Sequence, residues 1–283
     1  MRILLITDTH GKIDRINEFA AEYRADACIH CGDFGFFDAA SIRNLRSAEL
    51  QKMIRHCNRI MEKEKALLCA SSQEIQAEFI LQNRIAGTFD DYLTKKKSFC
   101  IPVYAVWGNH EDVRVIEQLR KDPLHNLTLL DEKTTVMLED IRLYGCGGDF
   151  NEKYLPLAKK LGIPWIRNQI KSAFWQYREL MDTLAQYPPG EKRIQITHAD
   201  PHECPFLETL AYRSGASLTL SGHMHRQESL QWETTDFSGL QETFPDLAAP
   251  EHTVSSIRHL NLPPAKPVIL EITGSNWKLE IEK

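Results

Sequence analysis

The sequence lacks the features that mark membrane-spanning, secreted and disulfide-bonded proteins. No apolar run approaches the ~20 residues that a transmembrane helix needs, and the first expected strand begins at Arg2, which leaves no room for a signal peptide. The seven cysteines are odd in number and irregularly spaced. This argues against a disulfide framework, and we expect no cysteine-based structural zinc site. These absences predict a protein of the reducing cytoplasm with no membrane partner.

An excess of positive charge is also missing. The formal net charge is -5 at pH 7, so the chain has no global basic field for nucleic acid or anionic membrane, although a local basic groove stays compatible with it. We find no internal repeat and no low-complexity tract. A chain of 283 residues that is 42% hydrophobic can bury a large core. Length alone allows one large domain or two small ones, and we predict a single domain over residues 1–283.

The chain does contain five short apolar strands, each of which ends in polar residues. Continuous rather than alternating hydrophobicity is typical of strands that are covered on both faces, and helical periodicity between the strands predicts an α/β fold. Ligands bind at strand ends in open α/β sheets. The polar residues that end the five strands are Asp8 and His10, then Asp33, then Asn109 and His110, then His198, and finally His223 and His225.

Residues 38–100 interrupt this alternation of strands and helices. Apolar residues at 50, 53, 54, 57, 60 and 61 share one helical face, and Ser71 with Glu74 resembles a capping box before a further helix. We predict a helical insertion of two or three helices over about 38–100. Both of its ends lie beside the polar strand ends, so we expect it to form a cap or wall over the site.

Later patterns complete the expected fold. A hairpin is expected to turn at Glu139–Asp140, and an apolar stripe over 166–184 predicts a core-facing helix. From Arg226 onward the pattern indicates a β meander, which closes with two strands around 274–276.

The strand-end residues together form a typical ligand set for transition metals. Mixed oxygen and nitrogen ligands suit Mn, Fe, Zn, Co or Ni better than Mg or Ca. Seven ligands exceed one tetrahedral zinc site but suit two divalent metals that share a carboxylate. Such a pair generates a hydroxide and holds both ends of an in-line displacement at phosphorus. The seven are Asp8, His10, Asp33, Asn109, His198, His223 and His225.

Each short motif has a plainer interpretation when taken alone. Asp-x-His or Gly-His-x-His is usually a turn, and His110 by itself could start a helix. His30 lies inside a strand and is better interpreted as a core histidine. His202 and Glu203 follow His198 and could line a pocket, but we assign them no role. The recurrence of polar residues at five strand ends is what indicates a site.

The order of these motifs resembles the calcineurin-like metallophosphoesterase superfamily from Met1 to about Arg226. The resemblance implies a four-layer α/β/β/α sandwich of two mixed sheets. It also implies that one metal is held by Asp8, His10, Asp33 and His225, and that Asp33 bridges to a second metal held by Asn109, His198 and His223. His110 would stand beside the phosphate as a proton donor or charge stabiliser, and manganese is the first choice of metal.

Further motifs narrow the class of substrate within this superfamily. Phosphoprotein phosphatases of the superfamily continue Gly-Asp with a Val-Asp-Arg-Gly type segment, whereas here the segment is Phe34 to Asp38. Three other segments are loosely similar to RNA lariat debranching enzymes: Cys31–Phe34, Gly108–Glu111 and Thr197–Pro201. Those enzymes typically carry Cys where this chain has Asp8. We predict a phosphodiesterase, with a nucleotide or nucleic acid as the possible phosphoester. The alternatives are a phosphomonoesterase for small metabolites or phosphoproteins, and a binding scaffold without catalysis.

Overall fold

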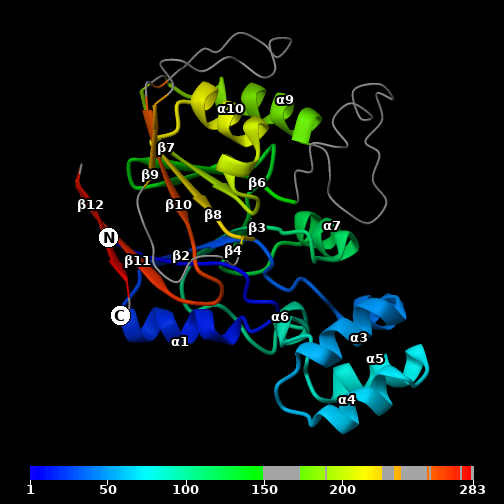
Figure 1. Cartoon of the computed structure of the whole chain (residues 1–283). Coiled ribbons are helices and arrows are strands. Elements are labelled where there is room, and N and C mark those ends of the chain that lie inside the picture. The colour runs from blue at the N-terminus through cyan, green and yellow to red at the C-terminus, as the bar shows by residue number, and fades with distance from the viewer. Residues whose placement is uncertain are drawn as a thin grey trace.

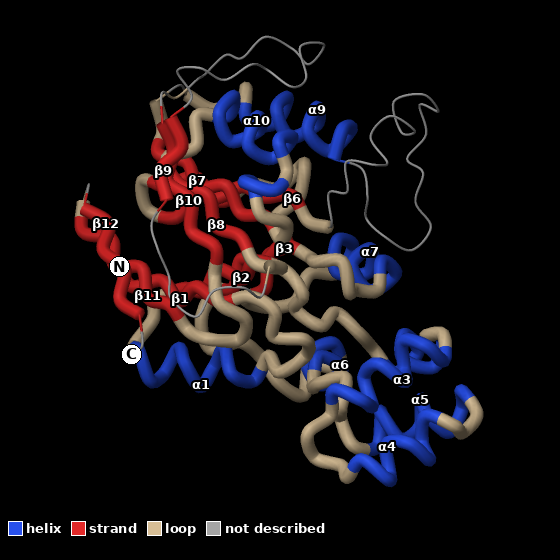
Figure 2. The backbone as a smooth tube through the Cα atoms, in the orientation of Figure 1, coloured by secondary structure: helices blue, strands red, loops and turns tan. Residues whose placement is uncertain are grey.

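The protein forms two mixed β-sheets that pack face to face, with helices on both outer faces (Figure 1). The computed structural model describes residues 1–148, 173–188, 190–224, 233–236, 254, 256–274 and 276–281. Each sheet contains six strands. Figure 2 shows the two sheets as red layers between blue helices. The predicted four-layer sandwich is therefore confirmed.

The first sheet has the strand order β12-β11-β1-β2-β3-β4. Strands β1 to β4 are parallel, and the terminal hairpin adds β11 antiparallel to β1. The hairpin around 274–276 is confirmed, but it joins this first sheet and does not continue a meander. The strands are β1 (Arg2–Ile6), β2 (Ala27–Cys31), β3 (Val103–Val106), β4 (Leu127–Leu129), β11 (Val268–Thr273) and β12 (Asn276–Ile281).

The second sheet has the strand order β5-β6-β7-β8-β10-β9. Its centre is parallel from β6 to β10, and β5 and β9 are antiparallel edges. The predicted hairpin is confirmed between β5 and β6, with Glu139 in the left-handed region. The strands are β5 (Val136–Leu138), β6 (Ile141–Cys146), β7 (Lys192–Thr197), β8 (Leu218–Ser221), β9 (Glu233–Asp236) and β10 (Ser256–Asn261).

Alternating side chains on each strand separate the interior into layers. On β1, Ile3 and Leu5 face the second sheet, whereas Leu4 and Ile6 face the helices of the first layer. Those helices are α1 (Asp14–Tyr23) and α7 (Val113–Lys121). The second sheet is covered by α9 (Ala173–Leu184) and α10 (Pro205–Ser214). In α9, Leu184 of the predicted stripe is buried and Met181 is partly buried against the same core, while 149–172 lie outside the described residues.

The cysteines make no disulfide. Cys28 and Cys31 have the Cys-x-x-Cys spacing, but both lie on β2. Side chains three residues apart on a strand point to opposite faces. Cys28 accordingly packs against the helical layer, and Cys31 packs between the sheets. This spacing therefore cannot form a metal site. Among the described residues, no helix is long and apolar enough to cross a membrane.

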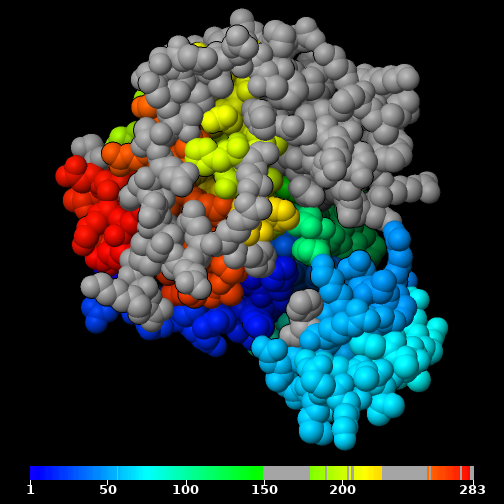
Figure 3. All heavy atoms as spheres, viewed as in Figure 1, coloured from blue at the N-terminus to red at the C-terminus, as the bar shows by residue number. Residues whose placement is uncertain are grey.

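The insertion contains five helical segments, more than the two or three expected. Four of them pack on one another around Ile42, Leu50, Ile54, Ala77 and Ile80, and they project from the body as a separate lobe (Figures 1 and 3). The fifth segment returns to the main core. The helices are α2 (Ala39–Asn44), α3 (Ser47–His56), α4 (Glu62–Cys69), α5 (Gln73–Gln82) and α6 (Phe89–Leu93).

Two local expectations for the insertion are wrong. The helix of the 50–61 stripe ends at His56, and Met61 is 74% exposed at the start of α4. The cap of α5 is Ser72, whose side chain accepts a hydrogen bond from the Ile75 amide. A capping box occurs instead at Asp38, where the chain enters α2. Both helices are present, but their boundaries differ from those predicted.

Candidate metal centre

The carboxyl ends of five parallel strands meet where the two sheets face each other. In the first sheet, the Asp8 amide donates to the Gly32 carbonyl at 3.0 Å. In the second sheet, the Gly222 amide donates to the His198 carbonyl, also at 3.0 Å. One contact joins the two sheets directly, because His198 Nδ1 lies 2.9 Å from the carbonyl oxygen of Cys31. The strand-end loops thus form one continuous site.

Four of the predicted ligands have strained backbones. Asp8, His10, Asp33 and His223 have φ angles of 54°, 44°, 50° and 70°. Residues other than glycine seldom adopt a positive φ, and such residues gather at functional sites because the surrounding structure holds them there. The turn after each strand therefore aims the side chain into the space between the sheets.

Two glycines provide room for this crowding. A Cβ on Gly108 would lie 2.0 Å from Asp33 Oδ1, and one on Gly222 would lie 2.0 Å from Thr7 Oγ1. Neither glycine has a positive φ in this structure. Glycine is therefore needed at these two positions because the Asp33 and Asp8 side chains approach the backbone closely, and not because the backbone makes a left-handed turn.

The deepest part of the site contains Asp8, Asp33 and His198. All three are buried, and one potential ligand atom from each lies within 4.8 Å of the others. Thr7 Oγ1 donates to Asp8 Oδ2 at 2.7 Å and holds that carboxylate in place. Two carboxylates and an imidazole buried together form a donor set that divalent transition metals bind.

His198 has one nitrogen fixed and the other turned toward the site. Its Nδ1 donates to the Cys31 carbonyl, so Nε2 faces the centre. Around Nε2 lie Asp33 Oδ1 at 3.5 Å, Asn109 Oδ1 at 3.1 Å and His223 Nδ1 at 3.2 Å. These four atoms come from both sheets. All of them can present lone pairs to one position, which is what a bound cation requires.

His10 and His110 lie at the more exposed rim. His10 Nε2 is 3.8 Å from Asp33 Oδ2, and the ring centroids of His10 and His110 are 5.8 Å apart. The His110 amide donates to Asp33 Oδ1 at 3.1 Å. The backbone of His110 is thus tied to Asp33 while its imidazole is accessible to a ligand.

In the metal-free protein, His198 and Asp33 form a buried ion pair. Burial alone would lower the pKa of His198, but its hydrogen bond to Asp33 and the negative charges of Asp33 and Asp8 raise that pKa to about 9. Burial alone would raise the pKa of Asp33, yet the histidines around it lower that pKa well below its usual range. A proton on His198 thus satisfies the lone pairs in the metal-free protein. Metals bind neutral imidazole and displace such a proton.

Glu111 is a positioning residue that the sequence analysis left without a role. Its carboxylate accepts from the Gly35 amide at 2.8 Å and also from the Gly108 amide. It therefore joins the loop after Asp33 to the loop before Asn109. Burial and the charge of Asp33 raise the pKa of Glu111 to about 8, although the two amide donors oppose that rise. The signal for this role in the sequence was its position directly after Asn109 and His110.

The structure brings together the predicted residues that it describes. Asp8, His10, Asp33, Asn109, His110, His198 and His223 all line the same junction between the sheets. His225 and the side chain of Glu203 lie outside the described residues. His30 is a buried core histidine as expected, 3.0 Å from Thr9 Oγ1. His202 packs against His259.

A model of the calcineurin-like phosphoesterase family matches residues 1–227, and the chain belongs to that family. Among solved structures, one crystal structure has a TM-score of 0.55 and 14% identity and covers 99% of this chain and 98% of its own. This likeness shows the fold alone. A search of curated proteins finds no match to the chain.

Two further similar structures belong to proteins with a named activity. A dimetal phosphatase from Danio rerio is 11% identical at a TM-score of 0.48, with 99% of this chain and 95% of that chain covered. An archaeal phosphodiesterase is 12% identical at a TM-score of 0.36, with full coverage of both chains. These two likenesses are too distant to support an argument. The family match is what identifies a metal-dependent phosphoester hydrolase of a dimetal class.

Proposed function

We propose that this enzyme hydrolyses phosphodiesters with two divalent transition metals, manganese being the first choice. The observation that carries the proposal is the convergence of lone pairs from both sheets around His198 Nε2 and Asp33. Buried carboxylate, amide and imidazole donors suit Mn, Fe, Zn, Co or Ni. The substrate is a phosphoester, and a nucleotide or nucleic acid fits this class. Its cytoplasmic location stays a prediction.

The two oxygens of Asp33 support a division of the ligands between two metals. Oδ2 faces His10, and Oδ1 faces His198. Asp33 would therefore bridge the two metals. The first metal would be held by Asp8, His10 and Asp33, together with His225 from outside the described residues. The second would be held by Asp33, Asn109, His198 and His223, because Asn109 and His223 lie beside His198 Nε2.

The residues of the chain supply binding and proton transfer. When bound, the two metals neutralise phosphate charge and lower the pKa of the attacking water. His110 has an exposed ring anchored by its own amide to Asp33. This places it to give a proton to the leaving oxygen or to stabilise that oxygen's charge. Thr7 and Glu111 hold the ligand loops in position.

The loop after Asp33 favours a diester over a monoester. Phe34 and Phe36 are fully buried in the main core, where their rings stack. This segment thus contributes aromatic packing and no cation toward the substrate. A phosphomonoester carries about 1.5 to 2 negative charges near neutral pH, whereas a diester carries one. The diester needs less positive charge beyond the metals.

The insertion forms one wall beside the rim histidines, within a single domain over 1–283. Its entry is fixed by Arg114, which bonds Asp38 and Ser41 shortly after His110 in the chain. The lobe of α2 to α5 ends beside His10, where the Thr88 amide donates to the Gly11 carbonyl at 3.1 Å. Both ends of this lobe therefore contact loops that carry predicted site residues.

The decisive assay compares two activated substrates with the manganese-loaded protein. We expect kcat/KM for bis-p-nitrophenyl phosphate to exceed that for p-nitrophenyl phosphate by at least about tenfold, which corresponds to about 1.4 kcal/mol. The Asp33→Asn protein controls for contaminating enzymes and should hydrolyse neither. A reversed ratio would establish the monoesterase alternative. Hydrolysis of neither substrate by the metal-loaded wild type would favour the scaffold.

A further inference from the structure

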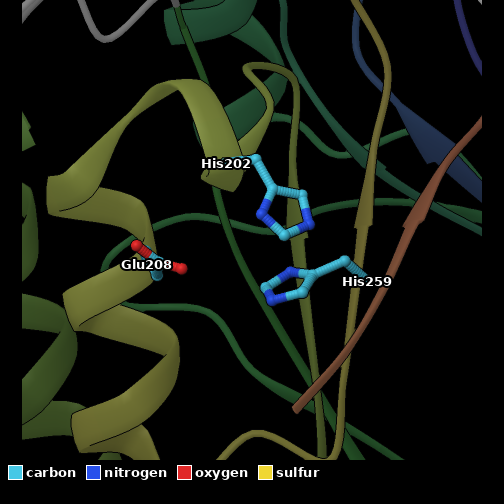
Figure 4. Close-up of side chains that lie close together, drawn as sticks. All are labelled: His202, Glu208 and His259. Carbon is cyan, nitrogen blue, oxygen red and sulfur yellow. The ribbon is translucent and has the colours of Figure 1, made fainter. Parts of the chain in front are cut away.

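A second group of potential metal ligands lies outside the metal centre. His202, Glu208 and His259 each place a ligand-type atom within 4.8 Å of the other two. They belong to three different elements: the short 3₁₀ helix η2 (Pro201–Glu203), α10 and β10. Figure 4 shows the two imidazole rings facing each other, with Glu208 beside them on the helix. None of the three belongs to the proposed two-metal set.

The sheet register explains why His259 points toward α10. Side chains two residues apart on a strand share a face, so His259 lies on the same face as Ile257. Ile257 packs with Leu207 and Leu210 under α10, whereas Leu260 packs between the sheets. This group therefore occupies the helix-covered outer face of the second sheet.

His259 has the hydrogen-bonding pattern of a metal ligand. It is only 3% exposed, and its Nδ1 lies 2.7 Å from Oγ1 of Thr219, its register partner on β8. Its Nε2 has no hydrogen-bond partner within the described part of the chain. A buried polar nitrogen without a partner costs free energy. Metal-binding histidines typically have one ring nitrogen held by a second group and the other turned to the ion.

Glu208 and His202 complete the group from the solvent side. Glu208 is half-buried in the first turn of α10. His202 is exposed, and the centroid of its ring lies 4.2 Å from the ring centroid of His259. The position of η2 is fixed by Asp200, which accepts from the His202 amide at 3.0 Å and from Asn261 Nδ2 at 2.8 Å. Asp200 thereby joins η2 to the end of β10.

The charge state of the group also suits a cation. Burial and the neighbouring His202 lower the pKa of His259 to about 4. The ring is therefore neutral at pH 7, as a metal ligand must be. Burial raises the pKa of Glu208, the charge of a protonated His202 opposes that rise, and the negative charge of Asp200 adds to it. A bound cation would offset the unfavourable charge on these carboxylates.

We propose that His202, Glu208 and His259 form a third, mononuclear metal site for Zn²⁺ or a similar divalent ion. Two imidazoles and one carboxylate are an established ligand type for zinc, with water at the fourth position. Tetrahedral zinc with bonds of 2.0–2.1 Å holds its ligand atoms about 3.4 Å apart. The ligand atoms here all lie within 4.8 Å of one another, and rotation of the exposed His202 side chain can bring them to the separation that zinc needs.

Such an ion would link η2, α10 and β10. His202 lies four residues after His198, so the ion would also anchor the loop that leaves the two-metal centre. We therefore expect zinc to stabilise this loop without taking part in hydrolysis. The site would then be structural, with an effect on thermal stability that is independent of turnover.

The test measures zinc binding to the full chain in an Asp8→Asn/Asp33→Asn background, which removes both carboxylates of the two-metal centre. Competition with a chromogenic chelator, together with the visible absorption of bound Co²⁺, gives stoichiometry and affinity. One equivalent should bind and raise Tm. Glu208→Gln and His202→Gln should each weaken binding by more than about 100-fold, beyond the range of outer-shell changes. Exposed His125 provides the matched control, and His125→Gln should bind as the parent does.

A further variant separates ligation from simple packing. Thr219→Val keeps the shape of the side chain but removes the hydroxyl that holds His259 Nδ1. We expect zinc affinity to fall about 10–100-fold, while the parent and the variant keep the same secondary structure. If Glu208→Gln, His202→Gln and His125→Gln all bind zinc with the same stoichiometry and affinity, the third site does not exist.

Discussion

At the residue scale, His110 and His30 show how two histidines of one fold take different roles. His110 has an exposed ring beside His10, with its backbone tied to Asp33. His30 is fully buried in β2, with Nε2 bonded to Thr9. The exposed ring can exchange protons with a substrate. The buried ring is held neutral by its surroundings and supports packing.

For His110, the expected effect of removal is on turnover and not on metal content. His110→Ala should lower kcat about 10²–10⁴-fold if the imidazole acts as a general acid, with unchanged metal stoichiometry. Alkoxide leaving groups need protonation more than nitrophenolate does, so the loss should be larger for alkyl esters. Steady-state kinetics on a matched pair of diesters checks this. Equal losses for both leaving groups would instead assign His110 to charge stabilisation.

For His30, the expected effect is on acid stability. Burial lowers its pKa in the folded protein from 6.5 to about 3. The unfolded chain therefore binds the proton first, and stability falls as the pH drops below 6.5. Between pH 7.5 and pH 5 this one group should cost about 2 kcal/mol. His30→Gln should reduce the pH dependence of the unfolding free energy by that amount in metal-free protein, as urea unfolding at the two pH values will measure. An unchanged difference would exclude His30 as its source.

At the element scale, the insertion is a lobe with its own small core. The apolar residues of α2 to α5 are buried among themselves, so they need no partner from the rim of the site or from a second subunit. In contrast, Phe89 and Tyr92 of α6 pack in the main core with Phe99. The part that can be removed is therefore residues 39–84. Deleting 38–100 would damage the sandwich itself.

Replacing residues 39–84 with a Gly/Ser linker tests whether the lobe restricts the substrate. Because its two ends adjoin the His10 and His110 loops, we expect hydrolysis of a small activated diester to persist within about tenfold. The ratio of activity on polymeric to small diesters should change. The control is metal content and thermal unfolding, which must match the parent. An unchanged selectivity ratio would remove the lobe from substrate selection.

At the scale of the whole molecule, the proposed metal centre lies where the two sheets meet. His198 and His223 follow strands of the second sheet, whereas Asp8 and Asp33 follow strands of the first. The direct polar contacts between them include the His198–Cys31 bond and the His223 amide bond to Asp8 at 3.2 Å. Metals bound at this junction should therefore stabilise the packing of one sheet on the other.

Chelation should accordingly lower the stability of the protein. With free Mn²⁺ at 100 times its dissociation constant, one site contributes about 2.7 kcal/mol. Treatment with a chelator should lower Tm, and added Mn²⁺ should restore it. Asp33→Asn, which removes the shared carboxylate, should abolish most of this metal-dependent difference in differential scanning calorimetry. If Asp33→Asn keeps the full shift, the ligand assignment is wrong.

The sequence by itself determined the strands, their polar ends and the class of chemistry. Continuous apolar runs that end in Asp8, Asp33 and His198 indicate buried parallel strands, since local hydrophobicity and turn residues are enough for that inference. The same local signals predicted the terminal hairpin and the helical character of the insertion. They did not predict which sheet the hairpin joins, because strand pairing depends on contacts far apart in the chain.

Only the tertiary structure decided what these residues face. Glu111 had no role until Gly35 and Gly108 were seen to donate to it, and the insertion's apolar residues had no partner until its helices packed together. His202, Glu208 and His259 lie up to 57 residues apart. No local pattern links them, and the register of β8 with β10 and the position of α10 bring them together. Side-chain clusters that span several elements follow from packing, which local sequence does not encode.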